Sequence, residues 1–147
     1  MSRQIWGAMP ILLAVAVSGI AGDEGERQNL VGSWVSENEP ASGWTIGNNN
    51  DTFQIKENQG DSTIAEYFCK ADGHDCQVKI AGKKGTVSMW FNGPKLVQIE
   101  TQGPTIVKRR FTALPQGEAI EVETIPIVPG GKPETVRFRR AQLSAQK

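Results

Sequence analysis

From Asp51 onward, short stretches that alternate apolar and polar residues are separated by Gly, Pro, Asn and Asp. This pattern is typical of antiparallel β-strands joined by tight turns, because successive side chains of a strand point to opposite faces. No window shows a clear helical apolar period, apart from a turn of helix around Glu26 to Leu30. The chain is therefore predicted to be all-β, with consecutive strands forming a meander.

Several of these stretches place apolar residues together on one face. They are Phe53 and Ile55; Val78 and Ile80; Val87, Met89 and Phe91; Val97 and Ile99; Val107 and Phe111, with Arg109 between them; Ile120 and Val122; and Val136 and Phe138. With a strand around Trp34, the pattern predicts about eight or nine strands. That many consecutive antiparallel strands favour closure into an up-and-down β-barrel, which removes exposed edges, while a β-sandwich is the alternative.

Two parts of the pattern concern the surface of this barrel. In the segment 62–70, Ile64 and Phe68 share one face and Tyr67 and Cys69 the other, so the segment could be covered on both sides. Trp44 and Trp90 are interpreted as aromatics on the outer surface or the rim. Exposed single aromatics of this kind need no functional explanation.

The first residues have the three parts of a cleavable secretory signal. A basic residue, Arg3, precedes an apolar core from Ile11 to Val17, and small residues follow at Gly19 and Ala21. This arrangement predicts a signal peptide over residues 1–21, cleaved after Ala21, and a secreted or periplasmic protein. A transmembrane anchor needs about 20 predominantly apolar residues, so stable membrane insertion of the mature chain is not expected.

The remaining chain is long enough for one domain with a single core. We expect a lead-in over 22–29, a barrel over 30–141 and a polar tail over 142–147, in a monomeric protein. The full chain has 16 basic and 16 acidic residues, and removing residues 1–21 takes away only Arg3, which leaves one net negative charge. Nucleic-acid partners are not expected, because they require a strongly basic face.

Both cysteines lie in FCKADGHDCQV, where Asp72-Gly73 is typical of a two-residue hairpin turn. Such a turn would place Cys69 directly opposite Cys76, at a separation that a disulfide tolerates. An oxidising compartment favours this cross-strand disulfide, with free thiols as the alternative. A metal site is not expected, because His74 is the only further ligand nearby and structural zinc needs four.

Arg109 alternates with Val107 and Phe111, which places its guanidinium in the barrel interior. An unpaired buried charge is costly. Three alternatives follow: Arg109 pairs with Glu66 or Glu100, it binds an anionic ligand, or a bulge turns it outward.

Catalytic chemistry finds little support in the sequence. His74 is the only histidine and lies in a turn, so no catalytic triad is predicted. Glu121 and Glu123 share the solvent face of a strand. The oxygen-rich segments 47–51 and 58–61 lack the spacing of a dedicated calcium loop and are interpreted as turns. We expect no catalytic residues, no metal and no cofactor.

The segment Leu30-Val31-Gly32-Ser33-Trp34 resembles the G-x-W opening of lipocalin-type barrels, and Arg139-Arg140 ends the last predicted strand. ADGHDCQV, TVSMWFNG and TVRFRR are similar to segments of small secreted bacterial lipocalin-like proteins of unassigned function. The resemblance implies that an arginine, Arg140, packs across Trp34 and closes one end of the barrel. The chain differs from animal lipocalins in being shorter and in lacking a clear helix after the eighth strand.

These observations lead to one main hypothesis and two others. The main one is an exported barrel that holds a small apolar or amphipathic molecule, with Met89, Phe111 and Arg109 lining the cavity. The second is a filled barrel that acts as a non-catalytic interaction or structural module of the cell envelope. The third, an enzyme, has no constellation of residues to support it.

Overall fold

The computed structural model describes residues 23–141, so the signal peptide predicted for residues 1–21 and the tail 142–147 lie outside the described residues. Ten strands follow one short helix. The helix is α1 (Asp23–Gln28), and the strands are β1 (Gly32–Ser36), β2 (Ser42–Asn49), β3 (Thr52–Gln59), β4 (Ser62–Lys70), β5 (Cys76–Ile80), β6 (Lys83–Asn92), β7 (Lys95–Gln102), β8 (Thr105–Ala113), β9 (Ala119–Val128) and β10 (Glu134–Arg140). Within this part of the chain no helix is long and apolar enough to cross a membrane.

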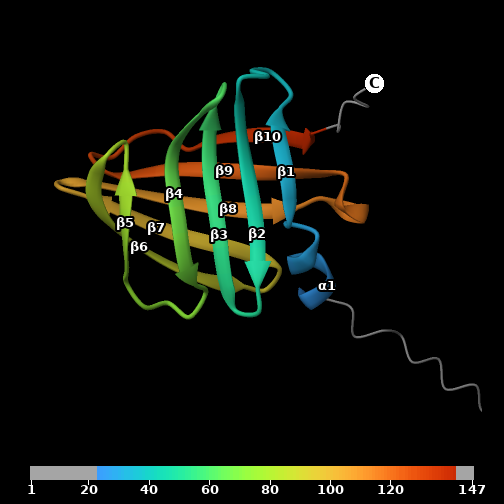
Figure 1. Cartoon of the computed structure of the whole chain (residues 1–147), viewed down its shortest axis with the longest axis horizontal. Coiled ribbons are helices and arrows are strands. Elements are labelled where there is room, and N and C mark those ends of the chain that lie inside the picture. Colours follow the sequence, from blue (N-terminus) through green and yellow to red (C-terminus); the bar gives the residue numbers. More distant parts are fainter. Residues whose placement is uncertain (1–22, 142–147) are drawn as a thin grey trace, which may run out of the picture.

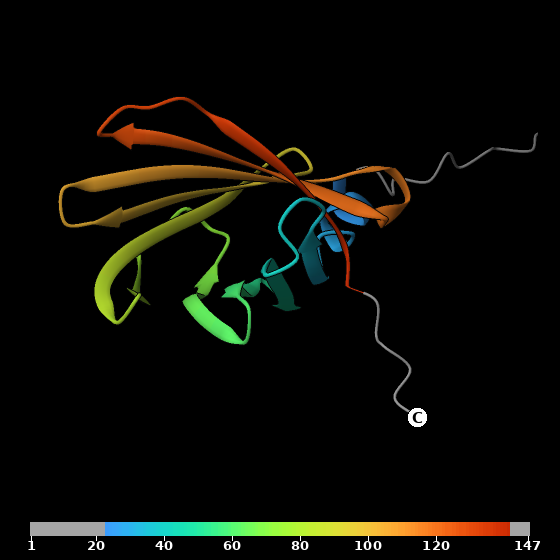
Figure 2. The same cartoon turned by 90° about the horizontal axis from the view of Figure 1, so that it is seen from above.

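The strands form a closed antiparallel barrel in which each strand pairs with its neighbours in the sequence and β1 pairs with β10. Figure 1 shows β1 to β4 crossing steeply over β7 to β10, and Figure 2 shows the two groups on opposite sides of the barrel. Up-and-down closure is confirmed, but there are ten strands and not eight or nine. The missed strand is β2, whose sequence SGWTIGNN hides its alternation behind two glycines and two asparagines.

The two ends of the barrel differ. Helix α1, the chain start of β1 and the end of β10 lie together at one end, here called the closed end. The β1–β2 connection and the β9–β10 connection lie at the opposite end, here called the open end, because the cavity described below is reached there. The helix expected around Glu26 to Leu30 is present slightly earlier, at Asp23–Gln28.

The interior face follows the predicted alternation on most strands. Val87 and Met89 on β6 and Phe111 on β8 are fully buried inside. On β4, Tyr67 points inward whereas Phe68 is 64% exposed, so this strand is covered on one side only.

One orientation prediction is wrong, and one strand carries polar residues on its inward face. Trp44 is not an outer aromatic: it is 5% exposed and packs edge to face on Phe111, with ring centroids 5.1 Å apart. On β7 the inward positions are held by Gln98 and Glu100, so Val97 and Ile99 occupy the outer face. Polar residues therefore replace apolar ones in part of the interior.

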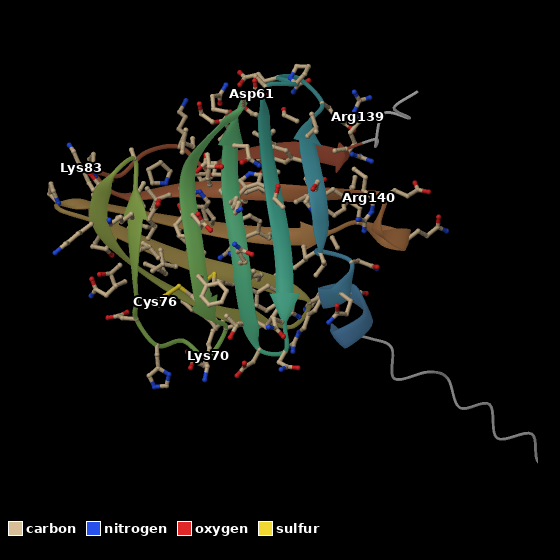
Figure 3. The ribbon with its side chains drawn as sticks, in the orientation of Figure 1. Asp61, Lys70, Cys76, Lys83, Arg139 and Arg140 are labelled. Atoms are coloured by element: carbon tan, nitrogen blue, oxygen red, sulfur yellow. A yellow bond between two sulfur atoms is a disulfide. The ribbon has the colours of Figure 1, made fainter. Side chains whose placement is uncertain are left out.

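A disulfide joins Cys69 on β4 to Cys76 on β5, with their Cα atoms 5.9 Å apart. Figure 3 shows it beside the labelled Cys76. The predicted pairing is correct, but the predicted turn is wrong, because Asp72 bridges to Trp90 on β6 and Gly73 donates to the Met89 carbonyl instead of closing a tight hairpin.

The disulfide strengthens the weakest seam of the barrel. Strands β4 and β5 share only two paired positions, Ala65 with Ile80 and Glu66 with Lys79. The covalent link lies on the closed-end side of these pairs, so it holds the two strands together where their hydrogen-bonded ladder has ended.

Replacing both cysteines by alanine is expected to lower the free energy of unfolding by about 2.5 kcal/mol, the chain-entropy value for a loop of this length closed between residues 69 and 76. Urea unfolding of the variant and the parent measures the change. The parent unfolded with a thiol reductant is the control, since it makes the same covalent change without mutation. Equal stability of all three samples would show that the seam holds without the link.

Candidate functional site

A cavity of about 420 Å³ enters the barrel from the open end. Its inner wall carries apolar side chains from three strands, namely Trp44 on β2, Val122 on β9, and Val136 and Phe138 on β10. This volume lies within the range of about 300 to 1,000 Å³ that is usual for small-molecule sites. The cavity is thus large enough for a small ligand and has an apolar wall to hold one.

Four charged side chains also line this cavity: Glu39, Glu57, Arg109 and Glu134. Glu57 comes from β3, next to a register shift between Glu57 and Asn58, and Arg109 comes from β8. Register shifts of this kind often redirect side chains beside functional sites. Glu57 and Trp44 are paired positions on neighbouring strands, so a carboxylate and an indole lie side by side on the interior face.

Arg109 is held by a hydrogen-bonded cluster beneath the cavity. Its Nη1 donates to Glu100 Oε2 at 2.8 Å and to Gln98 Oε1 at 3.2 Å, and the Tyr67 hydroxyl donates to Glu100 Oε1 at 2.6 Å. The Arg109 and Glu100 side chains are only 12% and 8% exposed. Of the three sequence-based alternatives, pairing with Glu100 is the one found. Glu66 lies on the outer face and binds Gln54.

The burial of this cluster fixes its charges. Burial lowers the pKa of Arg109, but Glu100, Tyr67 and Glu57 outweigh that effect, so its pKa is raised overall and the guanidinium stays charged. Burial also raises the pKa of the Tyr67 hydroxyl, and although Arg109 opposes this, Glu100 adds to it. Tyr67 therefore remains a hydrogen-bond donor to Glu100.

Glu57 is the unpaired member of the site. Burial is the largest cause that raises the pKa of its carboxyl, with Arg109 lowering it and Glu100 raising it further. Among residues 23–141, its carboxylate has no hydrogen-bond or ion-pair partner. Arg109 Nε is likewise buried without a partner in this part of the chain. Two polar groups beside the cavity, the Glu57 carboxylate and Arg109 Nε, are therefore without partners among residues 23–141.

The other residues predicted to line a cavity lie one layer deeper. Met89 and Phe111 are fully buried, outside the cavity wall. Met89 Sδ lies 3.9 Å from Gln98 Nε2, and Phe111 supports the indole of Trp44. Ligand binding by Arg109, Phe111 and Met89 stays a prediction, in which Arg109 alone would touch the ligand directly.

At the closed end, the Arg140 guanidinium lies 4.4 Å from the centre of the Trp34 ring. Its Nε donates to the Gly117 carbonyl at 2.7 Å and its Nη1 to the Val31 carbonyl at 3.1 Å, while Trp34 Nε1 donates to Leu30 at 2.8 Å. Figure 3 shows Arg140 directed toward β1 and α1. Gly32 has a φ of +147°, which L side chains rarely adopt, and Arg140 Nη1 occupies the space where a Cβ would lie.

Arg27 also covers this end, and its role could not be predicted, because in the sequence it is only an isolated basic residue of the lead-in. Its guanidinium lies 4.3 Å from the centre of the Phe91 ring and donates twice to the Gly93 carbonyl. Cation–π contacts and backbone carbonyls thus close the barrel with two arginines.

Other chemistry considered from the sequence lies away from the cavity. His74 is in the β4–β5 connection with its side chain 87% exposed, 3.2 Å from Asp72. The first oxygen-rich segment belongs largely to β2 and the second partly to β3, with only short turns between strands. Residues 23–141 contain no group of three His, Cys, Asp or Glu side chains placed to hold a metal ion.

Solved structures of other proteins resemble this barrel. A secretory abundant heat soluble (SAHS) protein from Ramazzottius varieornatus superposes with a TM-score of 0.63 at 9% identity, covering 77% of this chain and 96% of that protein. SAHS protein 4 from the same organism gives a TM-score of 0.59 at 12% identity, with coverages of 78% and 96%. Human cRBP IV gives 0.49 at 16% identity, with coverages of 76% and 98%.

These similarities concern the fold, a closed antiparallel up-and-down barrel that is lipocalin-like. At such low identities they describe the fold and leave activity to be argued from the site. The sequence matches no protein-family model and no curated protein.

Proposed function

We propose that this protein is an exported carrier or binding protein that holds a small amphipathic molecule in the open-end cavity. The observation that supports this proposal most directly is that an apolar wall and the charged side chains of Glu57 and Arg109 meet in one cavity of about 420 Å³. An apolar wall supplies affinity, and a few placed polar groups supply orientation. The apolar part of the ligand would lie against Val122 and Phe138.

Export is part of this proposal. A disulfide between Cys69 and Cys76 fits an oxidising compartment, whether periplasmic or extracellular. The signal peptide predicted for residues 1–21 would lead the chain there.

The alternative function is an interaction or structural module of the cell envelope with a filled barrel. The exposed Phe68 and Ile64 on the outer face of β4 favour it, because they share one side of the strand. The first function requires a ligand to bind inside the barrel, whereas the second does not. A small molecule that binds in the cavity therefore distinguishes the two.

A neutral fluorescent probe, Nile red, is expected to bind the wild-type protein with a dissociation constant on the order of 10 µM, as its size allows in an apolar site. Val136→Trp, which fills the cavity, should weaken binding at least about tenfold, whereas Thr135→Trp on the outer face should not. Val136 lies in the cavity wall and Thr135 is exposed. Fluorescence titration of the three proteins measures the effect.

Two outcomes would count against a ligand-binding barrel. One is that the wild-type protein does not take up the probe at all, as a filled barrel would behave. The other is that the two tryptophan variants bind it equally well, which would place the probe on the outer surface.

A further inference from the structure

The cavity that carries the proposed function is acidic. Three carboxylates line it, Glu39, Glu57 and Glu134, against one guanidinium, Arg109. That guanidinium is already paired with Glu100 at 2.8 Å. An anionic head group entering the cavity would meet three carboxylates that form no ion pair among residues 23–141, and an arginine whose charge is already neutralised by Glu100.

The arrangement around Glu57 fits a cation. Glu57 pairs in register with Trp44, so an indole ring and a carboxylate stand next to each other in the wall. The Arg109 guanidinium already lies 5.6 Å from the centre of the Trp44 ring, so this indole does contact a cation. The Glu57 carboxylate beside the ring adds direct charge attraction for a second one. Phe111 holds the indole edge to face, which limits its movement.

We infer that the cavity selects amphipathic molecules with a cationic head group, which Glu57 and Trp44 contact at the head-group position. This inference rests on the proposed function. The cation would supply the partner that the Glu57 carboxylate lacks among residues 23–141. Glu39 and Glu134 at the rim would attract the cation toward the cavity.

Acidification should weaken the binding of a permanently charged cation. Protonation of Glu57 removes its attraction, and because burial raises the pKa of this carboxyl, the loss begins at higher pH than for an ordinary glutamate. The other ionisable groups that face Glu57 or the cavity are Arg109 on β8, Glu100 on β7, Tyr67 on β4, Glu39 after β1 and Glu134 on β10. Glu57→Gln removes the contribution of Glu57 alone.

The test compares three probes that share one tail: octyltrimethylammonium, 1-octanol and octyl sulfate, titrated into the full mature protein by calorimetry. The cation is expected to bind at least about tenfold more tightly than the anion, the effect of one favourable charge contact. Glu57→Gln should reduce this preference to less than about threefold and flatten its pH dependence. Glu123→Gln makes the same charge change on the outer face, where Glu123 pairs with Arg110, and should keep the preference.

The possible results distinguish failure of cation selection from failure of the proposed binding function. Equal affinities, or tighter binding of octyl sulfate, would overturn cation selection while leaving an amphipathic cavity in place. Failure of all three probes to bind the wild type would overturn the proposed function as well. If Glu57→Gln did not fold, the order of the three affinities in the wild type would still decide the inference.

Discussion

Replacing Arg109 by leucine is expected to lower the free energy of unfolding by about 3 to 5 kcal/mol, the usual cost of breaking a buried ion pair from one side. The substitution removes the guanidinium that donates to Glu100 and Gln98. Glu100 would then keep a buried charge whose described partner is the Tyr67 hydroxyl alone. Urea unfolding of the variant and the parent measures the loss.

The neighbouring arginine provides a matched control. Arg110 is the next residue on β8, but it points outward and pairs with Glu123 at 3.0 Å, with both side chains about one-third exposed. Arg110→Leu should therefore cost no more than about 1 kcal/mol. Similar losses of unfolding free energy for the two variants would show that burial does not make the Arg109–Glu100 pair more important for stability than the exposed pair.

A second substitution separates the lost contact from the charge left behind. Adding Glu100→Leu to Arg109→Leu should recover most of the stability, because a buried pair replaced by apolar residues is often neutral or better. Tyr67→Phe completes the series by removing the hydroxyl that would otherwise lack its acceptor. If the double variant were as unstable as the single one, packing and not charge would be the cause.

Strand alternation was sufficient to predict much of this fold. The sequence TIVKRRFTAL places Arg109 inside between Val107 and Phe111, and the structure agrees. The predicted disulfide between Cys69 and Cys76 is also present, although the Asp72-Gly73 hairpin from which it was argued is not. The orientation of Arg109 was predictable because side chains on a strand alternate strictly, whatever the rest of the fold does.

The parts that failed are those where polar groups occupy the interior. On β7, Val97 and Ile99 suggest the inward face, yet Gln98 and Glu100 hold it because they bind Arg109. Their partner lies on another strand, so no pattern within one strand could reveal them. Trp44 was misplaced for a related reason: its neighbours Gly43 and Gly47 leave β2 without visible alternation.

In the candidate site, too, one residue could be predicted from the sequence and another could not. Arg109 could be singled out from the sequence because a charge between two apolar residues is unusual inside a strand. Glu57 could not, since KEN at the end of β3 is typical of a strand running into solvent. Its place in the cavity wall depends on barrel closure, which brings β3 opposite β8, β9 and β10 around one cavity.

Replacing Trp34 by alanine is expected to cost about 3 to 5 kcal/mol, as for other large aromatic side chains removed from a core. Trp34 is fully buried at the closed end and donates to the Leu30 carbonyl. Its loss would leave a void and would remove the ring beneath Arg140, whose guanidinium lies 4.4 Å from the ring centre. Urea unfolding, followed by circular dichroism, measures the change.

Trp90→Ala is the matched control for this substitution. Trp90 lies on the outer face of β6 opposite Val97 and is only partly buried, so its removal should cost less than half as much. If Trp34→Ala lost no more stability than Trp90→Ala, the contact of Trp34 with Arg140 would not be what stabilises this end of the barrel.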